Sequence, residues 1–111
     1  MVLQMNKLHI SDAALNDLDE IQDYIESELE NAEAALHAVS EITKRLRILQ
    51  NHAEAGPSLS SIADAVSNYR FLVCGNYIAF YRAEKADVYV DRILYGRRDY
   101  LRILFGESID G

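Results

Sequence analysis

Two amphipathic stretches in the first half of the chain constrain the fold more than any other feature of the sequence. In each stretch apolar residues recur every three or four positions, which is the period of one helix face. Ser11 and Asn31 are suited to cap the two predicted helices, which cover residues 12–30 and 32–50. The first stripe consists of Leu15, Leu18, Ile21, Ile25 and Leu29, and the second of Ala32, Ala35, Leu36, Val39, Ile42, Leu46 and Leu49. One residue separates the helices, so the pattern predicts an antiparallel helical hairpin that the rest of the chain must cover.

The covering layer is predicted to be a sheet. Alternating residues over 7–10 indicate an opening strand. Later in the chain, Gly75-Asn76 is a typical hairpin turn between two of three β-rich runs. These runs cover residues 69–74, 77–83 and 88–95. The first strand and the helical hairpin are therefore expected to pack on an antiparallel sheet, which is an α+β fold.

Two further segments complete the predicted order β-α-α-β-β-β-α. Gly56-Pro57 marks a turn within a loop over residues 51–67, and residues 97–105 indicate a short terminal helix. A chain of 111 residues has room for one core, so we expect a single domain over residues 1–111.

Both faces of the strand hairpin predicted over residues 69–83 are largely apolar. One face carries Tyr69, Phe71, Val73, Ile78, Phe80 and Arg82, and the other carries Arg70, Leu72, Cys74, Tyr77, Ala79 and Tyr81. The aromatic rings of Phe71 and Phe80 favour the first face as the core side. Since the helices can cover only one face, the second is covered by a partner, by the loop over 51–67 or by the terminal helix, and these alternatives stay open.

The charge is uneven along the chain. The net charge is −7, yet residues 1–67 hold 12 acids and 4 bases, whereas residues 68–111 hold 6 acids and 7 bases. The total counts against a general nucleic-acid binder, which should be basic. Eight acids lie between Ser11 and Glu30, and we interpret them as a solvated helix face.

Arginines and tyrosines gather in the second half of the chain. They are Arg70, Tyr77, Tyr81, Arg82, Arg92, Tyr95, Arg97, Arg98 and Tyr100. Arginine offers a fixed fork of donors for phosphate or carboxylate, and tyrosine adds a stacking face. The cluster is therefore suited to RNA, DNA or an acidic protein segment. The alternative is ordinary ion pairing with Glu84, Asp87, Asp91 and Asp99.

Several kinds of site are missing from the sequence. It has no phosphate-binding glycine loop, no nucleophile elbow and no metal-type His/Cys spacing, because His9, His37 and His52 are scattered. Cys74 is the only cysteine and is expected to be a buried thiol. We therefore expect no metal and no cofactor. No apolar run is long enough to span a membrane and no signal peptide is visible, so a cytoplasmic location is expected.

Three stretches together form a pattern that covers almost the whole chain. The first is I-S-x-x-A-x-x-D-L-x-x-I-x-x-Y-I, which begins at Ile10 and includes Asp17 and Tyr24. The second has Tyr69-Arg70 and Gly75 followed by the run Y-I-A-F-Y-R, and the third is R-I-L-Y-G-R-R-D-Y over residues 92–100. In order and spacing this resembles the RelE/ParE toxin superfamily of bacterial type II toxin–antitoxin modules. The resemblance implies a helical hairpin on an antiparallel sheet.

Two activities occur in this superfamily. RelE-like members are ribosome-dependent mRNA endonucleases, for which the resemblance implies Arg70, Arg98 and Tyr100 as catalytic residues. That set is incomplete here, because Ile78 and Leu72 stand where basic residues are common and no histidine is placed as a base.

ParE-like members poison DNA gyrase and have no known nucleolytic site. The C-terminal half is closer to this pattern, so we favour a gyrase poison that is not an enzyme. The implied target-binding residues are Arg82, Arg92, Tyr95, Arg97 and Arg98. An acidic body also suits a protein target better than ribosomal RNA. An inactive interaction domain of the same fold is a further alternative.

The resemblance also implies a cognate antitoxin, which forms a hetero-oligomer with the toxin. Antitoxins of the family lay a C-terminal segment, often a helix and a strand, across the toxin. We expect Phe71, Ile78 and Phe80 to contact it. The family places Ile78 on the open side of the sheet, which conflicts with a core position for Phe80. A Phe80→Asp change discriminates, since it costs stability in a core and antitoxin binding at an interface.

Overall fold

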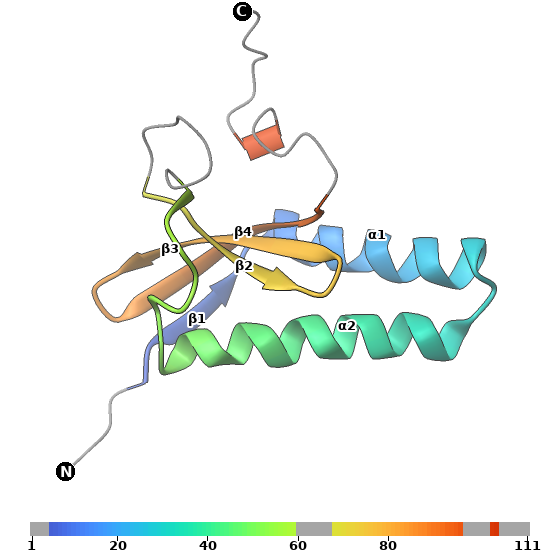
Figure 1. Cartoon of the computed structure of the whole chain (residues 1–111), viewed down its shortest axis with the longest axis horizontal. Coiled ribbons are helices and arrows are strands. Elements are labelled where there is room, and N and C mark those ends of the chain that lie inside the picture. Colours follow the sequence, from blue (N-terminus) through green and yellow to red (C-terminus); the bar gives the residue numbers. More distant parts are fainter. Residues whose placement is uncertain (1–4, 60–67, 97–102, 105–111) are drawn as a thin grey trace, which may run out of the picture.

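Two long helices and a four-stranded sheet form two layers (Figure 1). The computed structural model describes residues 5–59, 68–96 and 103–104. The elements are β1 (Lys7–Ile10), α1 (Asp12–Glu28), α2 (Ala32–Arg47), the 3-10 turn η1 (Ile48–Gln50), β2 (Arg70–Cys74), β3 (Tyr77–Glu84) and β4 (Asp87–Tyr95). The predicted α+β fold is confirmed. Of the predicted terminal helix over 97–105, only Ile103 and Leu104 are among the described residues, and both are helical.

Both helices begin where the sequence predicts, because a polar side chain caps each first turn. Ser11 Oγ accepts a hydrogen bond from the Ala14 N–H at 3.0 Å, and Asn31 Oδ1 accepts one from the Ala34 N–H at 2.9 Å. These bonds satisfy amides that have no partner within the helix. The helices end two and three residues earlier than predicted.

The sheet is mixed rather than wholly antiparallel. Its strand order is β1-β4-β3-β2, and the last three strands in the chain pair antiparallel as predicted. The turn between β2 and β3 has Gly75 at φ +66°, a conformation that glycine adopts without strain. β1 pairs in parallel with residues 87–90 of β4. Residues 91–95 of β4 therefore extend beyond β1, and α1 lies against this part of the strand (Figure 1).

The helices cover the sheet face that carries Leu72, Cys74, Ala79 and Tyr81. The interpretation that Phe71 and Phe80 form the core side beneath the helices is therefore wrong. Tyr81 lies on the helix-covered face instead. Its hydroxyl donates a hydrogen bond to the Ala53 carbonyl at 2.8 Å and accepts one from the Gly56 N–H at 2.9 Å. A fully buried ring thus leaves no polar atom unsatisfied.

The opposite face holds a smaller apolar cluster. Leu59, Phe80 and Leu94 are buried in it, and Tyr69, Phe71, Ile78, Ile103 and Leu104 pack against them. Residues of the loop and of the C-terminal region thus cover Phe80, which has no exposed surface. Phe80→Asp would bury a carboxylate, so we expect it to lower the free energy of unfolding in a denaturant titration.

Three leucines and one alanine, Ala32, of the predicted stripes lie outside the core. Leu15, Leu29 and Leu36 are 49%, 64% and 61% exposed. Leu29 and Leu36 flank the turn of the helical hairpin, which reaches past the end of the sheet (Figure 1). The helical period identifies one face but does not show how far the covering layer extends.

The single cysteine is buried as predicted. Cys74 is 4% exposed, and burial raises the pKa of its thiol to about 11. Neither helix in the described part of the chain has the length and apolar content that crossing a membrane requires.

Candidate functional site

Asp17 joins α1 to the part of β4 that lies beyond its pairing with β1. Its carboxylate accepts hydrogen bonds from Arg92 Nε and Nη2, both at 2.8 Å, and from the Ile93 N–H at 2.9 Å. The bond with Asp17 raises the pKa of Arg92, while burial lowers it to a smaller extent. Asp17 is only 4% exposed, so this acid does not belong to the solvated helix face.

Ser11 brings α1 into this position. Its N–H donates to the Val90 carbonyl at 3.0 Å, and its Oγ donates to the Asp91 carbonyl at 2.8 Å. The serine that caps the helix therefore also fixes the helix to the edge of β4. Asp17 lies on the same helix and continues this contact along the strand.

Arg82 lies in a second charged cluster on the sheet. Its Nε donates to Asp91 Oδ2 at 2.8 Å and its Nη1 to Glu84 Oε2 at 3.1 Å, while its guanidinium lies 5.1 Å from the centre of the Tyr89 ring. Tyr69 Oη donates to the same Asp91 oxygen at 2.9 Å. The hydrogen bond with Asp91 raises the pKa of Arg82. The ion-pair alternative thus holds for Arg82 with Glu84 and Asp91.

Arg70 binds a neighbouring loop and does not contribute its guanidinium to an open cationic surface. Its Nη1 donates to the Gly56 carbonyl at 2.7 Å. Gly56 packs so closely on β2 that an added Cβ would lie 2.1 Å from the Phe71 carbonyl oxygen, so only glycine fits there. Of the three residues predicted for a ribonuclease site, Arg70 is the one among the described residues, and its guanidinium holds the loop at Gly56.

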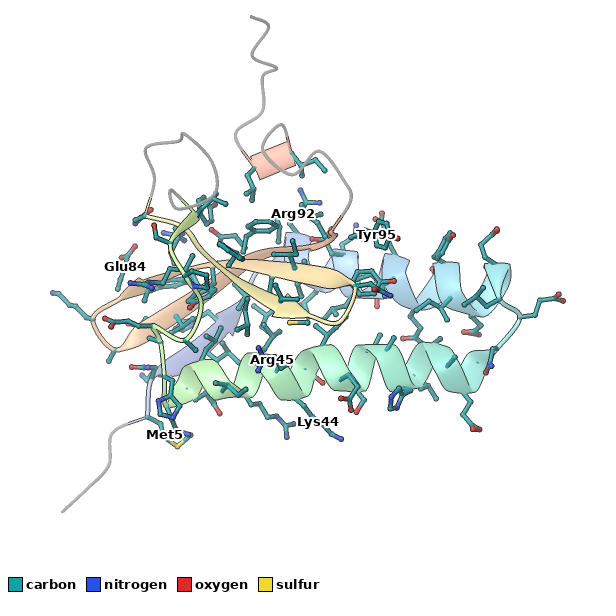
Figure 2. The ribbon with its side chains drawn as sticks, viewed as in Figure 1. Met5, Lys44, Arg45, Glu84, Arg92 and Tyr95 are labelled. Carbon is teal, nitrogen blue, oxygen red and sulfur yellow. The ribbon has the colours of Figure 1, made fainter. Side chains whose placement is uncertain are left out.

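The remaining predicted site residues are placed as follows. Arg97, Arg98, Asp99 and Tyr100 lie outside the described residues. Tyr95 is 43% exposed at the end of β4 and lines a groove together with residues of α1 (Figure 2). Of the residues expected at the antitoxin, Phe71 and Ile78 are half-buried and Phe80 is buried. Asp87, which was also predicted to pair with an arginine, contacts His9 at 2.8 Å instead.

A groove of about 760 Å³ runs between α1, the end of β4 and the turn that joins β2 to β3. We call it the α1–β4 groove. It is lined by Asp17, Glu20, Ile21, Tyr24, Ile25, Leu29, Ala38, Asn76, Tyr77, Ile93, Leu94 and Tyr95. Glu20 was not predicted as a site residue, and Leu29 was predicted only as part of the buried helix stripe, although an apolar residue beside acids on one helix is a visible signal. Within the described ranges, no group of His, Cys, Asp and Glu side chains is placed to hold a metal ion.

The order of one strand, two helices and three strands in a mixed four-stranded sheet is the fold of a RelE/ParE superfamily toxin. Residues 8–100 match the family model described as the ParE toxin of the type II toxin–antitoxin system parDE. The chain therefore belongs to the ParE toxin family of type II toxin–antitoxin systems.

A solved structure supports this assignment. A chain of the structure described as "Chromosomal ParDE TA system from P. aeruginosa" is 29% identical, with a TM-score of 0.70, over 82% of this chain and 96% of that chain. No curated protein matches the sequence significantly.

Proposed function

We propose that this ParE-family toxin inhibits growth by poisoning DNA gyrase. The observation that carries the proposal is the character of the sheet face opposite the helices. On that face an apolar cluster around Leu59, Phe80 and Leu94 lies beside Arg82, whose guanidinium is already paired with Asp91 and Glu84. Cleavage of RNA requires cations that stabilise the charge developing on phosphate. Arg70, the described member of the ribonuclease set, instead donates to the Gly56 carbonyl.

The charge of α1 supports a protein target. Asp19, Glu20, Asp23, Glu26 and Glu28 are all exposed along this helix. Such a surface repels the phosphates of ribosomal RNA and mRNA, because like charges oppose approach over about 10 Å at moderate salt. An acidic body does not hinder binding to a protein in this way.

A cognate antitoxin of the ParD type is the second partner that we propose. The family is defined by type II modules, in which a protein antitoxin neutralises the toxin, and the similar solved structure is described as a ParDE system. We expect the two proteins to form a hetero-oligomer.

The test compares two activities of one preparation. Gyrase supercoiling and ribosome-dependent mRNA cleavage are measured side by side, with wild type, Arg98→Ala and Tyr100→Phe chains. We expect wild type to inhibit supercoiling, the antitoxin to relieve this inhibition, and no mRNA cleavage above background.

Cleavage that is lost in both variants would identify a RelE-like ribonuclease and overturn the proposal. Absence of both activities, with no growth defect on expression, would indicate an inactive interaction domain of the same fold.

A further inference from the structure

The α1–β4 groove presents three tyrosines. Tyr24 is 61% exposed and Tyr95 is 43% exposed. Tyr77 lies with its ring centre 5.8 Å from that of Tyr95, at 63° between the ring planes. All three side chains line the same groove. Burial raises the pKa of Tyr77, and the Tyr95 and Tyr24 phenols raise it further. Figure 2 shows Tyr95 at the end of β4, beside α1.

One exposed acid, Glu20, lines the groove, and it belongs to a helix whose charged side chains are all acidic. α1 carries five exposed acids between residues 19 and 28 and no lysine or arginine over its whole length. No basic residue lines the groove among the described residues. Asp17 is already neutralised by Arg92, so Glu20 is the lining carboxylate that remains exposed. The rim is therefore complementary to a cationic ligand.

The sheet edges next to the groove offer few backbone groups with which a ligand segment could pair as an extra strand. Asp17 accepts the Ile93 N–H on the β4 edge. On the β2 edge, residues 57–59 exchange backbone hydrogen bonds with Tyr69 and Phe71, and Arg45 Nε donates to the Val73 carbonyl at 3.2 Å. A ligand in the α1–β4 groove is therefore recognised through its side chains rather than by strand pairing.

We propose that the α1–β4 groove binds a basic, partly apolar segment of the cognate antitoxin. A Lys or Arg side chain of that segment lies against the rings of Tyr24, Tyr77 and Tyr95 and faces Glu20, while apolar neighbours contact Ile25 and Leu29. Tyrosine faces attract a cation, and a carboxylate at the rim strengthens the attraction. This inference rests on the proposed function, since it requires a cognate antitoxin.

Two other occupants fit less well. A second copy of the chain would bring its own acidic helix to an acidic rim, and like charges across an interface are unfavourable. The last seven residues of this chain include Glu107 and Asp110 but no lysine or arginine. They therefore lack the cation that the groove requires.

The experiment measures binding of the full-length antitoxin, encoded by the reading frame next to the toxin, by isothermal titration calorimetry. Tyr24→Ala and Glu20→Lys are the test variants, because both side chains are exposed and line the groove. Each is expected to weaken binding about fivefold to tenfold or more, as the loss of a cation–aromatic or charge contact implies. Raising the salt concentration should weaken wild-type binding and affect Glu20→Lys much less.

Matched controls use exposed residues that do not line the groove. Glu33→Lys makes the same charge change in the first turn of α2, and Leu36→Ala removes an exposed apolar side chain. Both should bind the antitoxin like wild type. Denaturant unfolding of all four variants verifies that none has lost its fold.

The outcomes separate this inference from the proposed function. If wild type inhibits gyrase and is neutralised, but the test variants bind the antitoxin as tightly as the controls, the groove is not the antitoxin site. Variants that lose gyrase inhibition and keep antitoxin affinity would assign the groove to gyrase and likewise overturn the inference. A wild-type chain that does not inhibit gyrase overturns the gyrase proposal alone, provided that antitoxin binding still depends on Tyr24 and Glu20.

Discussion

Two arginines of β3 and β4 each bind a carboxylate, in different surroundings. The side chains of Arg82 and Arg92 are equally exposed, at 30%. Arg92 forms two bonds with Asp17, whose side chain is 4% exposed, whereas Arg82 divides its bonds between Asp91, at 21%, and Glu84, at 53%.

The difference shows that the acid, rather than the arginine, determines what each contact does. Asp17 belongs to a helix and also accepts the Ile93 N–H, so it links two elements that are far apart in the sequence. Asp91 and Glu84 belong to the same pair of strands as Arg82, which the backbone already holds together. The Arg92 contact therefore holds α1 against β4, and its acid, Asp17, lines the α1–β4 groove.

The largest effect is expected for Asp17→Ala. This change leaves the buried Ile93 N–H and the partly buried guanidinium of Arg92 without their shared acceptor. We expect the free energy of unfolding to fall by about 3–5 kcal/mol, as for other broken buried pairs. Urea unfolding followed by circular dichroism measures it. Asp19→Ala, on the exposed side of the same helix, should change stability by less than about 0.5 kcal/mol. Equal effects for the two variants would show that Asp17 has no special role.

Arg92→Lys tests whether the two-bond geometry matters. Lysine keeps the positive charge but cannot reproduce the planar fork that donates to both Asp17 oxygens. We expect a loss of about 1–3 kcal/mol in the same unfolding measurement, from one weakened and one missing charged hydrogen bond. Wild-type stability in this variant would mean that charge alone is sufficient.

Arg82→Ala should have a smaller effect. Asp91 keeps the hydrogen bond from Tyr69 Oη, and the vacated side is partly open to water. We expect a loss of about 1 kcal/mol, near the upper end for exposed ion pairs. The comparison fails if this loss matches that of Asp17→Ala.

Glu84→Ala is expected to have the smallest effect. Its carboxylate is 53% exposed and bonds Arg82 at 3.1 Å, so water replaces it readily. Stability should change by less than about 0.5 kcal/mol, and the change should disappear at high salt. A salt-independent loss above 1 kcal/mol would place Glu84 in a structural network that the geometry does not show.

Local patterns made much of the fold predictable from the sequence. The helix starts follow from Ser11 and Asn31, and the hairpin turn from Gly75, because each depends on residues close by in the chain. The parallel pairing of β1 with β4 was not predictable in this way. The pattern of four residues over 7–10 does not specify which strand they join.

The candidate site was less predictable because its contacts are long-range. Asp17 has the same helical surroundings in the sequence as the solvated acids of α1, and its partners lie 75 and 76 residues away. Arg92 was assigned to target binding for the same reason. That Asp17 binds the Arg92 guanidinium is evident only from the structure, in which α1 lies beside β4.

A double-mutant cycle on Asp17 and Arg92 tests most directly whether this pair holds α1 to β4. The free energies of unfolding of wild type, Asp17→Ala, Arg92→Ala and the double variant are measured in urea under one set of conditions. We predict a coupling energy of about 1.5–3 kcal/mol, at the upper end for residues in contact. Additive effects, with a coupling below about 0.5 kcal/mol, would contradict the account.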